Sequence, residues 1–217
     1  KKLSKKLNIP FVTACSSGTA GLHLAALALN IGPGDGVIIP SVSFVATANC
    51  IKYVGGKVIF SDVDPLNGLM SPDNLINAIK FAKKNKIKLK IIILVHLNGQ
   101  TQFSEKIWKI AKKNNLFIIE DACHALGTKY NSHHAGLFGM TGCFSFYPTK
   151  QITTGEGGMV ITNDKAVYNK IKMLKAFGID KDINNRSKPG HYDVKLLGLN
   201  YRMTDFQSVM GYTQILR

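Results

Sequence analysis

The sequence has no long apolar run. Its longest run of large aliphatic residues covers residues 91–95, whereas a membrane-spanning helix needs about 18 consecutive apolar residues. The basic start, KKLSKK, is not followed by the apolar segment of a secretory signal. We therefore expect neither a membrane span nor a secretory leader. Because residue 1 is lysine and not methionine, we expect the chain to begin partway through a longer protein.

Acidic residues and arginine are both scarce. The chain carries 28 lysine and arginine residues against 13 aspartate and glutamate residues, a net charge of +15. The excess is mostly lysine, in the stretches KKLSKK, KFAKKNKIKLK and KIAKKNN. Aromatic residues do not alternate with these lysines as in a base-stacking platform, and specific base readout relies more on arginine, asparagine and glutamine. We therefore interpret the lysines as solvated helix faces and expect no nucleic-acid partner.

Cysteine is also scarce and forms no CxxC pair. The four cysteines lie in apolar segments: Cys15, Cys50, Cys123 and Cys143. Such residues are typically buried free thiols in a reducing compartment, so we expect a cytoplasmic protein. A metal site needs closer ligand spacing. The adjacent His133 and His134, with His124 nearby, lack the i, i+4 spacing of helical ligands, and we expect no metal.

The rest of the composition is that of a compact globular domain. Of the 217 residues, 45% are hydrophobic and 19% are charged, which is enough apolar material for a core and too much for a disordered chain. Short apolar runs alternate with segments of helical periodicity. Strands are expected at residues 11–14, 37–39, 57–61, 89–95, 116–119, 142–146 and 158–162, and helices at about 20–30, 44–54, 72–84 and 105–113, from 165 and from 204. This alternation predicts an α/β fold with a mainly parallel sheet and helices on both faces.

In such a sheet, ligands bind at the carboxyl ends of the strands, so the residues that follow each strand are candidates for a site. The first candidate is the turn SSGTAGLHLA, in which Ser17, Gly18 and Thr19 precede a helix. Free backbone N–H groups at a helix N-terminus bind anions, and glycine allows close approach. The alternative is a plain helix cap by Ser17 or Thr19.

The second candidate is the segment IIEDACH, residues 118–124. Its aliphatic strand delivers two carboxylates, Glu120 and Asp121, together with His124, to the ligand edge of the sheet. A carboxylate in that place can hold a cationic ring nitrogen by a charge-assisted hydrogen bond. The alternative is that Asp121 caps the following turn.

The third candidate is Lys150, in the stretch CFSFYPTKQITTGEGGMVITND. It lies between two predicted strands, close to a proline and before a glycine-rich turn. Desolvation and nearby cations can turn a lysine in such a position into a nucleophilic amine that forms a Schiff base. The alternative is a solubilising surface lysine.

Taken in order, these segments resemble the pyridoxal phosphate (PLP)-dependent aminotransferases that act on nucleotide-linked keto sugars, a branch of the fold-type I enzymes in the aspartate aminotransferase superfamily. The resemblance covers nearly the whole chain and rests on PSVSFVATAN, VHLNGQ, EDACHALG, FSFYPTKQITTGEGGMVITND and LGLNYRMTDFQSVMG. It implies the three-layer α/β/α large domain of these enzymes, with residues 1–175 as the PLP-binding domain and residues 176–217 leading toward a C-terminal domain. We expect the family's N-terminal arm and small C-terminal domain to be missing, and the loop of residues 180–191 has no clear counterpart in the family.

The resemblance also implies roles for single residues. Lys150 matches the lysine that binds the cofactor covalently and shuttles a proton between substrate and cofactor. Asp121 matches the carboxylate at the pyridine nitrogen, Phe44 the aromatic ring stacked on the cofactor, and His124 a residue near its ring hydroxyl. Asn200 matches an asparagine that reaches the phosphate of the partner subunit, which implies a homodimer. The phosphate cradle corresponds to Ser17, Gly18, Thr19 and Ser145.

The implied reaction transfers an amino group from glutamate to a keto carbon of a nucleotide-linked deoxyhexose, for amino-sugar and surface-glycan biosynthesis. His124 and the run ITTGEGG resemble members that act at C4 more than those that act at C3. A related dehydratase branch has histidine where this chain has Lys150. Two other interpretations stay open. One is a non-catalytic protein, either a PLP-fold relative or a basic nucleic-acid binder, and the other is a different fold-type I reaction such as decarboxylation or desulfuration.

Overall fold

Seven strands form the central sheet of the structure, a computed structural model that describes residues 2–180, 188 and 190–216. Their order across the sheet is β1-β9-β8-β5-β4-β2-β3. The pairs β2–β3, β2–β4, β4–β5 and β5–β8 are parallel, whereas β9 is antiparallel to both β8 and β1. The predicted mainly parallel sheet is confirmed. The strands are Phe11–Cys15 (β1), Asp35–Pro40 (β2), Lys57–Ser61 (β3), Lys88–Val95 (β4), Phe117–Asp121 (β5), Thr141–Ser145 (β8) and Gly158–Thr162 (β9).

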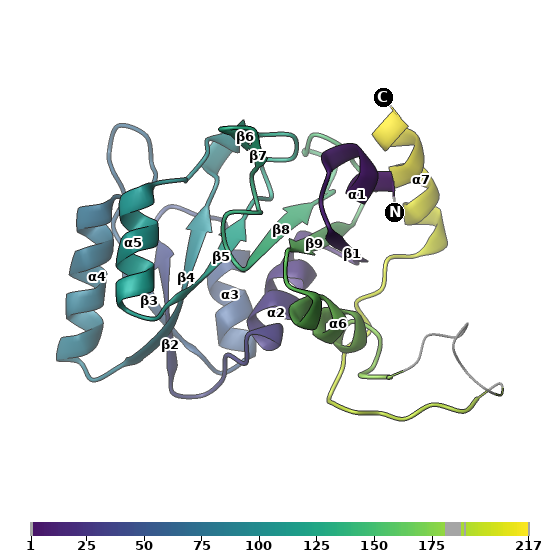
Figure 1. The fold of residues 1–217 in the computed structure, drawn as a ribbon, viewed down its shortest axis with the longest axis horizontal. Helices are drawn as coiled ribbons and strands as arrows, with labels where there is room; N and C mark the ends of the chain where they lie inside the picture. Colours follow the sequence, from purple (N-terminus) through teal and green to yellow (C-terminus); the bar gives the residue numbers. More distant parts are fainter. Residues whose placement is uncertain (1, 181–187, 189, 217) are drawn as a thin grey trace.

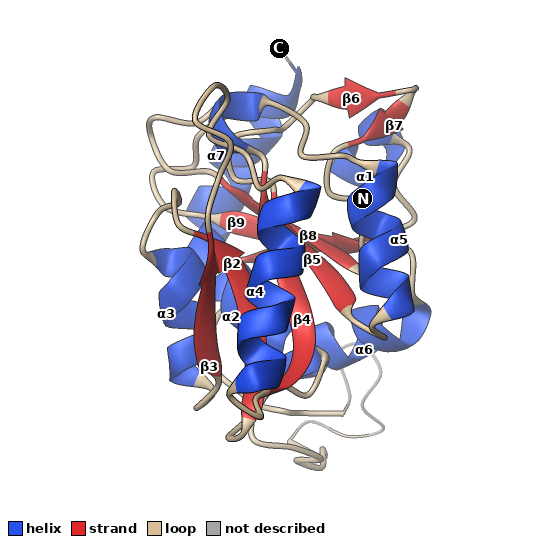
Figure 2. Ribbon diagram, turned by 90° about the vertical axis from the view of Figure 1, so that its left-hand side faces the viewer, coloured by secondary structure: helices blue, strands red, loops and turns tan. Residues whose placement is uncertain are grey.

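Helices cover both faces of this sheet (Figures 1 and 2). Along β4, Ile91 and Ile93 pack with α2, α3 and α6, whereas Ile92 and Leu94 pack with α4 and α5. Because both faces are covered, the strands are continuous apolar runs, as in other parallel sheets. The helices are Lys2–Leu7 (α1), Gly18–Ala28 (α2), Ala46–Tyr53 (α3), Pro72–Lys84 (α4), Glu105–Lys113 (α5), Lys165–Leu174 (α6) and Asp205–Leu216 (α7), with a 3-10 turn at Leu97–Gly99 (η1).

The predicted helices form, and two of their starts differ in ways that shape the site. α2 begins at Gly18, about two residues earlier than expected, because Ser17 caps it by accepting the backbone N–H of Ala20. α3 begins at Ala46 and not near Phe44. Phe44 therefore lies in the loop between β2 and α3, where its side chain is free to face a ligand.

A short hairpin and a short helix are among the elements not expected from the sequence. A hairpin joins Lys129–Tyr130 (β6) to His133–His134 (β7) through Asn131 and Ser132, which both have positive φ angles. Two-residue strands carry no readable periodicity. The other element is α1, which lies beside α7 (Figure 1), and there Lys6 donates a hydrogen bond to the carbonyl of Ile215.

The segment after α6 returns to the sheet. The backbone of Ala176 pairs with that of Asn200, and the carbonyl of Tyr201 accepts the N–H of Ser16 just before α2. Most of the loop 180–191 lies outside the described residues, and the domain boundary at residue 175 stays a prediction. Among the helices that the structure describes, none is both long and apolar enough to cross a membrane.

Candidate active site

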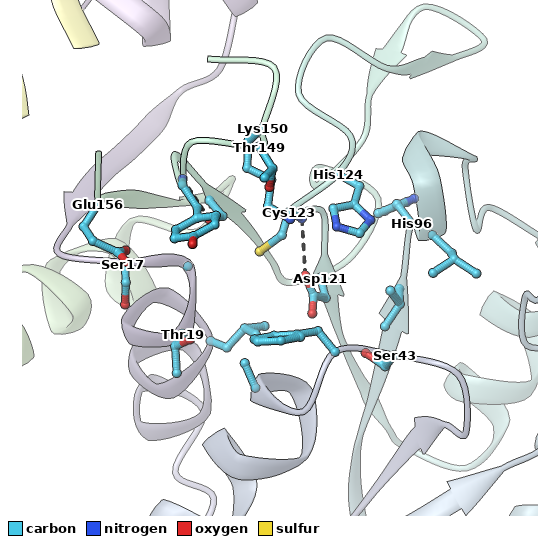
Figure 3. Close-up of a pocket in the computed structure, with 18 residues that line it drawn as sticks. Ser17, Thr19, Ser43, His96, Asp121, Cys123, His124, Thr149, Lys150 and Glu156 are labelled. Carbon is cyan, nitrogen blue, oxygen red and sulfur yellow. Dashed lines mark hydrogen bonds between the residues drawn. The ribbon is translucent and has the colours of Figure 1, made fainter. Parts of the chain in front are cut away.

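A cavity of about 580 Å³ opens at the carboxyl ends of β4, β5 and β8, between the N-terminus of α2 and the connection from β8 to β9 (Figure 3). This is the edge at which parallel sheets bind ligands. The structure brings eight of the nine predicted site residues to the cavity wall: Ser17, Gly18, Thr19, Phe44, Asp121, His124, Ser145 and Lys150.

The N-terminus of α2 provides an anion cradle. Of its first backbone N–H groups, that of Ala20 donates to the Ser17 hydroxyl at 3.0 Å and that of Gly21 to the Ser17 carbonyl at 3.0 Å. The N–H groups of Gly18 and Thr19 have no recorded partner among the described residues. Ser17 thus caps the helix, as the alternative interpretation held, and still leaves two donors at the positive end of the helix dipole for an anion.

Gly18 is needed for this cradle to form. A Cβ atom there would lie 2.8 Å from the Cβ of Ser145 and 3.0 Å from the Sγ of Cys123. A Cβ on Gly158 would likewise lie 2.5 Å from the carbonyl carbon of Ser17. The two glycines therefore let the first turn of α2 approach the ends of β8 and β9 closely.

Asp121 ends β5 as a nearly buried carboxylate, with 6% of its surface exposed. Its Oδ2 accepts the hydroxyl of Thr47 at 2.8 Å, and its Oδ1 accepts the backbone N–H of Cys123 at 3.3 Å (Figure 3). The described residues include no lysine, arginine or histidine paired with it. Asp121 caps the following turn, as the alternative held, but a buried carboxylate without a cation also calls for a cationic ligand.

The cysteine thiols around Asp121 are neutral. Burial first, and then the charge of Asp121, raise the pKa of Cys50, Cys123 and Cys143. Burial also raises the pKa of Cys15, to about 12. All four cysteines are free thiols, as predicted, and they are neutral at physiological pH.

Glu120 does not belong to the cavity, which corrects the sequence-based expectation that β5 delivers both carboxylates to the ligand edge. Successive side chains on a strand point to opposite faces, and Glu120 is fully buried away from Asp121. It accepts hydrogen bonds from Nε2 of His96 at 2.7 Å and from the backbone N–H groups of Gly136 at 2.7 Å and Gly139 at 2.5 Å. Its role is to tie the ends of β4 and β5 to the loop before β8.

Lys150 lies in the turn between β8 and β9, as predicted, and is half-buried in the cavity wall. Its backbone N–H donates to the Tyr147 carbonyl at 2.9 Å. Burial and the ammonium of Lys150, only partly opposed by Asp121, lower the pKa of His124. The Nδ1 of His124 accepts the N–H of Asn98 at 3.3 Å, so the neutral ring carries its proton on Nε2.

Two predicted positions lie at the margin of the site or outside it. Phe44 lines the mouth of the cavity with 72% of its surface exposed. Asn200 is absent from the described cavity wall, is exposed, and accepts a hydrogen bond from Nε of Arg202 at 3.2 Å. The expectation that Asn200 reaches a partner's cofactor stays a prediction.

Sequence reasoning missed three residues in and behind the cavity wall. Thr47 is fully buried and contacts Asp121, and Ser43 lines the cavity and contacts Thr47. Both lie in the quoted stretch PSVSFVATAN at a spacing of four residues, which was the available signal. Cys123 also lines the cavity.

The paired histidines contribute no described metal site. His134 is buried, and its Nε2 accepts the N–H of Gly127 at 2.9 Å while its Nδ1 donates to the carbonyl of Ala135 at 2.6 Å. His133 is exposed. No group of three or more potential metal ligands occurs within the described part of the chain.

The sequence matches, over residues 1–217, the model of the DegT/DnrJ/EryC1/StrS aminotransferase family. The chain belongs to this family. A GDP-perosamine synthase of Escherichia coli O157:H7 is 39% identical over 214 residues, which are 99% of this chain and 55% of that protein. The chain spans about half the length of the curated relatives it matches.

Solved structures of the family have the same fold. A DegT/DnrJ/EryC1/StrS aminotransferase from Brucella abortus matches with a TM-score of 0.90 and 33% identity, over 99% of this chain and 56% of that one. The NtdA structure from Bacillus subtilis, solved with the cofactor PMP, matches with a TM-score of 0.84 and 30% identity, over 98% of this chain and 46% of that one.

The cofactor of the family is PLP, and the residues that line the cavity fit it. The open N–H groups of Gly18 and Thr19 suit a phosphate, and the unpaired carboxylate of Asp121 suits a cationic ring nitrogen. The amine of Lys150 suits an aldehyde.

Proposed function

We propose that the protein is a PLP-dependent aminotransferase that moves an amino group from glutamate to the C4 keto carbon of a nucleotide-linked deoxyhexose. The proposal rests on three features that share the wall of one cavity. There, an open anion cradle, a buried carboxylate without a cation and a half-buried lysine face the same space. A structural lysine or a plain helix cap would not require all three together.

The proposed division of labour follows from the contacts. The N–H groups of Gly18 and Thr19 hold the phosphate, with the Ser145 hydroxyl beside them, and Phe44 covers the ring. Asp121 accepts the ring N–H and keeps that nitrogen protonated. When bound, the cofactor supplies an electron sink for the carbon that loses its proton.

Lys150 and His124 move or position protons in this proposal. The amine of Lys150 holds the cofactor covalently and then carries the proton between the substrate carbon and the cofactor. The Nε2–H of neutral His124 donates toward the ring hydroxyl. Its lowered pKa keeps the ring uncharged beside the lysine.

The finer parts of the proposal have separate support. The name of the Escherichia coli O157:H7 relative, GDP-perosamine synthase, supports a nucleotide-linked sugar as the amino acceptor. The C4 position rests on His124 and the ITTGEGG run.

We further propose a cytoplasmic homodimer in which Asn200 contacts the partner's cofactor. We also propose a PLP-binding domain over residues 1–175, with residues 176–217 leading to a second domain. The exposed apolar side chain of Val42, two residues before Phe44, supports burial by a partner.

The test is a two-substrate assay on the protein expressed with all the chain that its gene encodes on either side of residues 1–217. It is incubated with PLP, glutamate and a nucleotide-linked 4-keto-6-deoxyhexose, and 2-oxoglutarate and the amino sugar are measured by mass spectrometry and NMR. We expect both products in equal amounts, with the new amine at C4. Lys150→Ala should form neither, whereas Lys106→Ala, which removes an exposed lysine of α5, should behave like wild type.

Three outcomes would contradict this proposal. Release of carbon dioxide or sulfide without 2-oxoglutarate would indicate another fold-type I reaction. Amination at C3 would retain the reaction class and overturn the C4 assignment. Salt-sensitive binding to DNA without any binding of PLP would favour the nucleic-acid alternative.

A further inference from the structure

We propose that Thr47, held by Ser43, is a positioning residue that fixes Asp121 to receive a cationic ring nitrogen. This inference rests on the proposed function and assigns a role to a residue that does not itself line the cavity. The inference rests on two consecutive hydrogen bonds. They link Ser43, in the cavity wall, through Thr47 to the Asp121 carboxylate.

The chain of hydrogen bonds is short and almost closed to solvent. The Thr47 hydroxyl donates to Oδ2 of Asp121 at 2.8 Å, and the hydroxyls of Ser43 and Thr47 lie 2.6 Å apart. Thr47 is fully buried, and Asp121 is 6% exposed. Ser43 and Asp121 both line the cavity (Figure 3), whereas Thr47 lies behind the wall in the first turn of α3.

The direction of the two hydrogen bonds is fixed by chemistry. A carboxylate only accepts, so the single hydroxyl hydrogen of Thr47 is used on Asp121. Ser43 must therefore donate to the oxygen of Thr47, which polarises the second bond in the same direction. The two hydrogen bonds thus both donate toward Asp121.

The donors that contact the Asp121 carboxylate are all uncharged. Its Oδ1 accepts the backbone N–H of Cys123, its Oδ2 accepts the hydroxyl of Thr47, and the Cys123 thiol also hydrogen-bonds to the carboxylate. These bonds hold the carboxylate plane against rotation, and Asp121 itself lines the cavity with lone pairs left for a further donor. Since the described residues place no ion-pairing cation beside it, a ligand with a positively charged N–H group suits this position.

The test measures binding and does not depend on turnover. The protein, expressed with its full chain, is titrated with pyridoxamine phosphate, which cannot bond covalently to Lys150, and with the analogue in which a CH group replaces the ring nitrogen. Thr47→Val, which keeps the shape and removes the hydroxyl, should weaken the binding of pyridoxamine phosphate about tenfold. Binding of the analogue should change less than about twofold, because it has no ring N–H for Asp121.

Further variants separate positioning from general stability. Thr47→Ser keeps the hydroxyl and should restore most of the affinity, and Ser43→Ala should cause a smaller loss with the same preference for the ring nitrogen. Thr13 is the matched control, because it is a buried threonine whose hydroxyl has no hydrogen-bond partner among the described residues. Thr13→Val should bind both ligands like wild type.

The outcomes distinguish this inference from the proposed function. If wild type binds pyridoxamine phosphate and Thr47→Val binds it equally well, Thr47 is not a positioning residue and the proposed function stands. Equal losses for both ligands would also overturn the inference, because they would show a general distortion of the cavity. If wild type binds neither pyridoxamine phosphate nor PLP, both the inference and the proposed function fail.

Discussion

Gly18 lies where the first turn of α2 meets the end of β8, and its lack of a side chain decides how close the two elements come. The neighbouring atoms are the Cβ of Ser145 and the Sγ of Cys123, at 2.8 and 3.0 Å from the position of a Cβ on Gly18. Ser145 begins a polar turn and Cys123 is held by Asp121, so neither side chain can move away without disturbing the cavity.

Gly18→Ala should therefore weaken cofactor binding more than it weakens the fold. We expect the first turn of α2 to shift by several tenths of an ångström, which misaligns the N–H groups of Gly18 and Thr19, and the affinity for pyridoxamine phosphate to fall about tenfold or more. Isothermal titration calorimetry measures the affinity. Gly32→Ala is the control, because no atom lies within 4 Å of a Cβ there, and wild-type affinity in Gly18→Ala would contradict the cradle.

The sequence predicted which residues carry the chemistry better than it predicted the groups that surround them. The residue types and the strand ends predicted the places of Lys150 and Asp121, because polar side chains that follow buried strands meet at one edge of the sheet. The sequence could not separate Glu120 from Asp121, since both follow the same apolar run. Only the pairing of Glu120 with His96 and two loop N–H groups shows which carboxylate is structural.

At the scale of elements, the β6–β7 hairpin carries a histidine that is held neutral. Burial is the main cause that lowers the pKa of His134, and it is only partly opposed by the hydrogen bond to the Ala135 carbonyl and by the charge of Glu120. The Nε2 of His134 accepts the Gly127 N–H, so protonation would place two N–H donors against each other. The stability of the hairpin therefore depends on whether the His134 ring is protonated.

Acid should destabilise the protein in part through His134. Because its folded pKa lies below the unfolded value of about 6.5, the unfolded chain binds the proton first as the pH falls. The contribution of His134 to stability is therefore complete above pH 6.5 and decreases below it until the folded pKa is reached. We expect the difference in Tm between wild type and His134→Gln to shrink from pH 8 to pH 5.5, as measured by differential scanning calorimetry. A difference that is independent of pH would contradict the assignment.

The long elements could be predicted from periodicity, and the short ones could not. Strands such as β4 and β5 are uninterrupted apolar runs that helices cover on both faces, and α4 covers the expected residues 72–84, with Ser71 as its cap. The β6–β7 hairpin depends on the positive φ angles of Asn131 and Ser132. Two paired residues in each strand leave no pattern to read.

At the scale of the whole molecule, the sheet order brings distant segments of the chain to one cavity. Residues from α2, from the loop before α3 and from the ends of β5 and β8 meet there although they are spread from Ser17 to Glu156. The family resemblance predicted this assembly, and the parallel strand pairing explains it. The role of Asn200 stays a prediction, because its expected target belongs to a second subunit.

The most direct test of the proposed active site is the absorbance spectrum of the protein, expressed with its full chain, after addition of PLP and then glutamate. We expect a visible band if PLP bonds to Lys150, and glutamate should bleach that band. Lys150→Ala should show no such band. A colourless wild-type protein, or a variant that keeps the band, would contradict the assignment of this cavity as an aminotransferase active site.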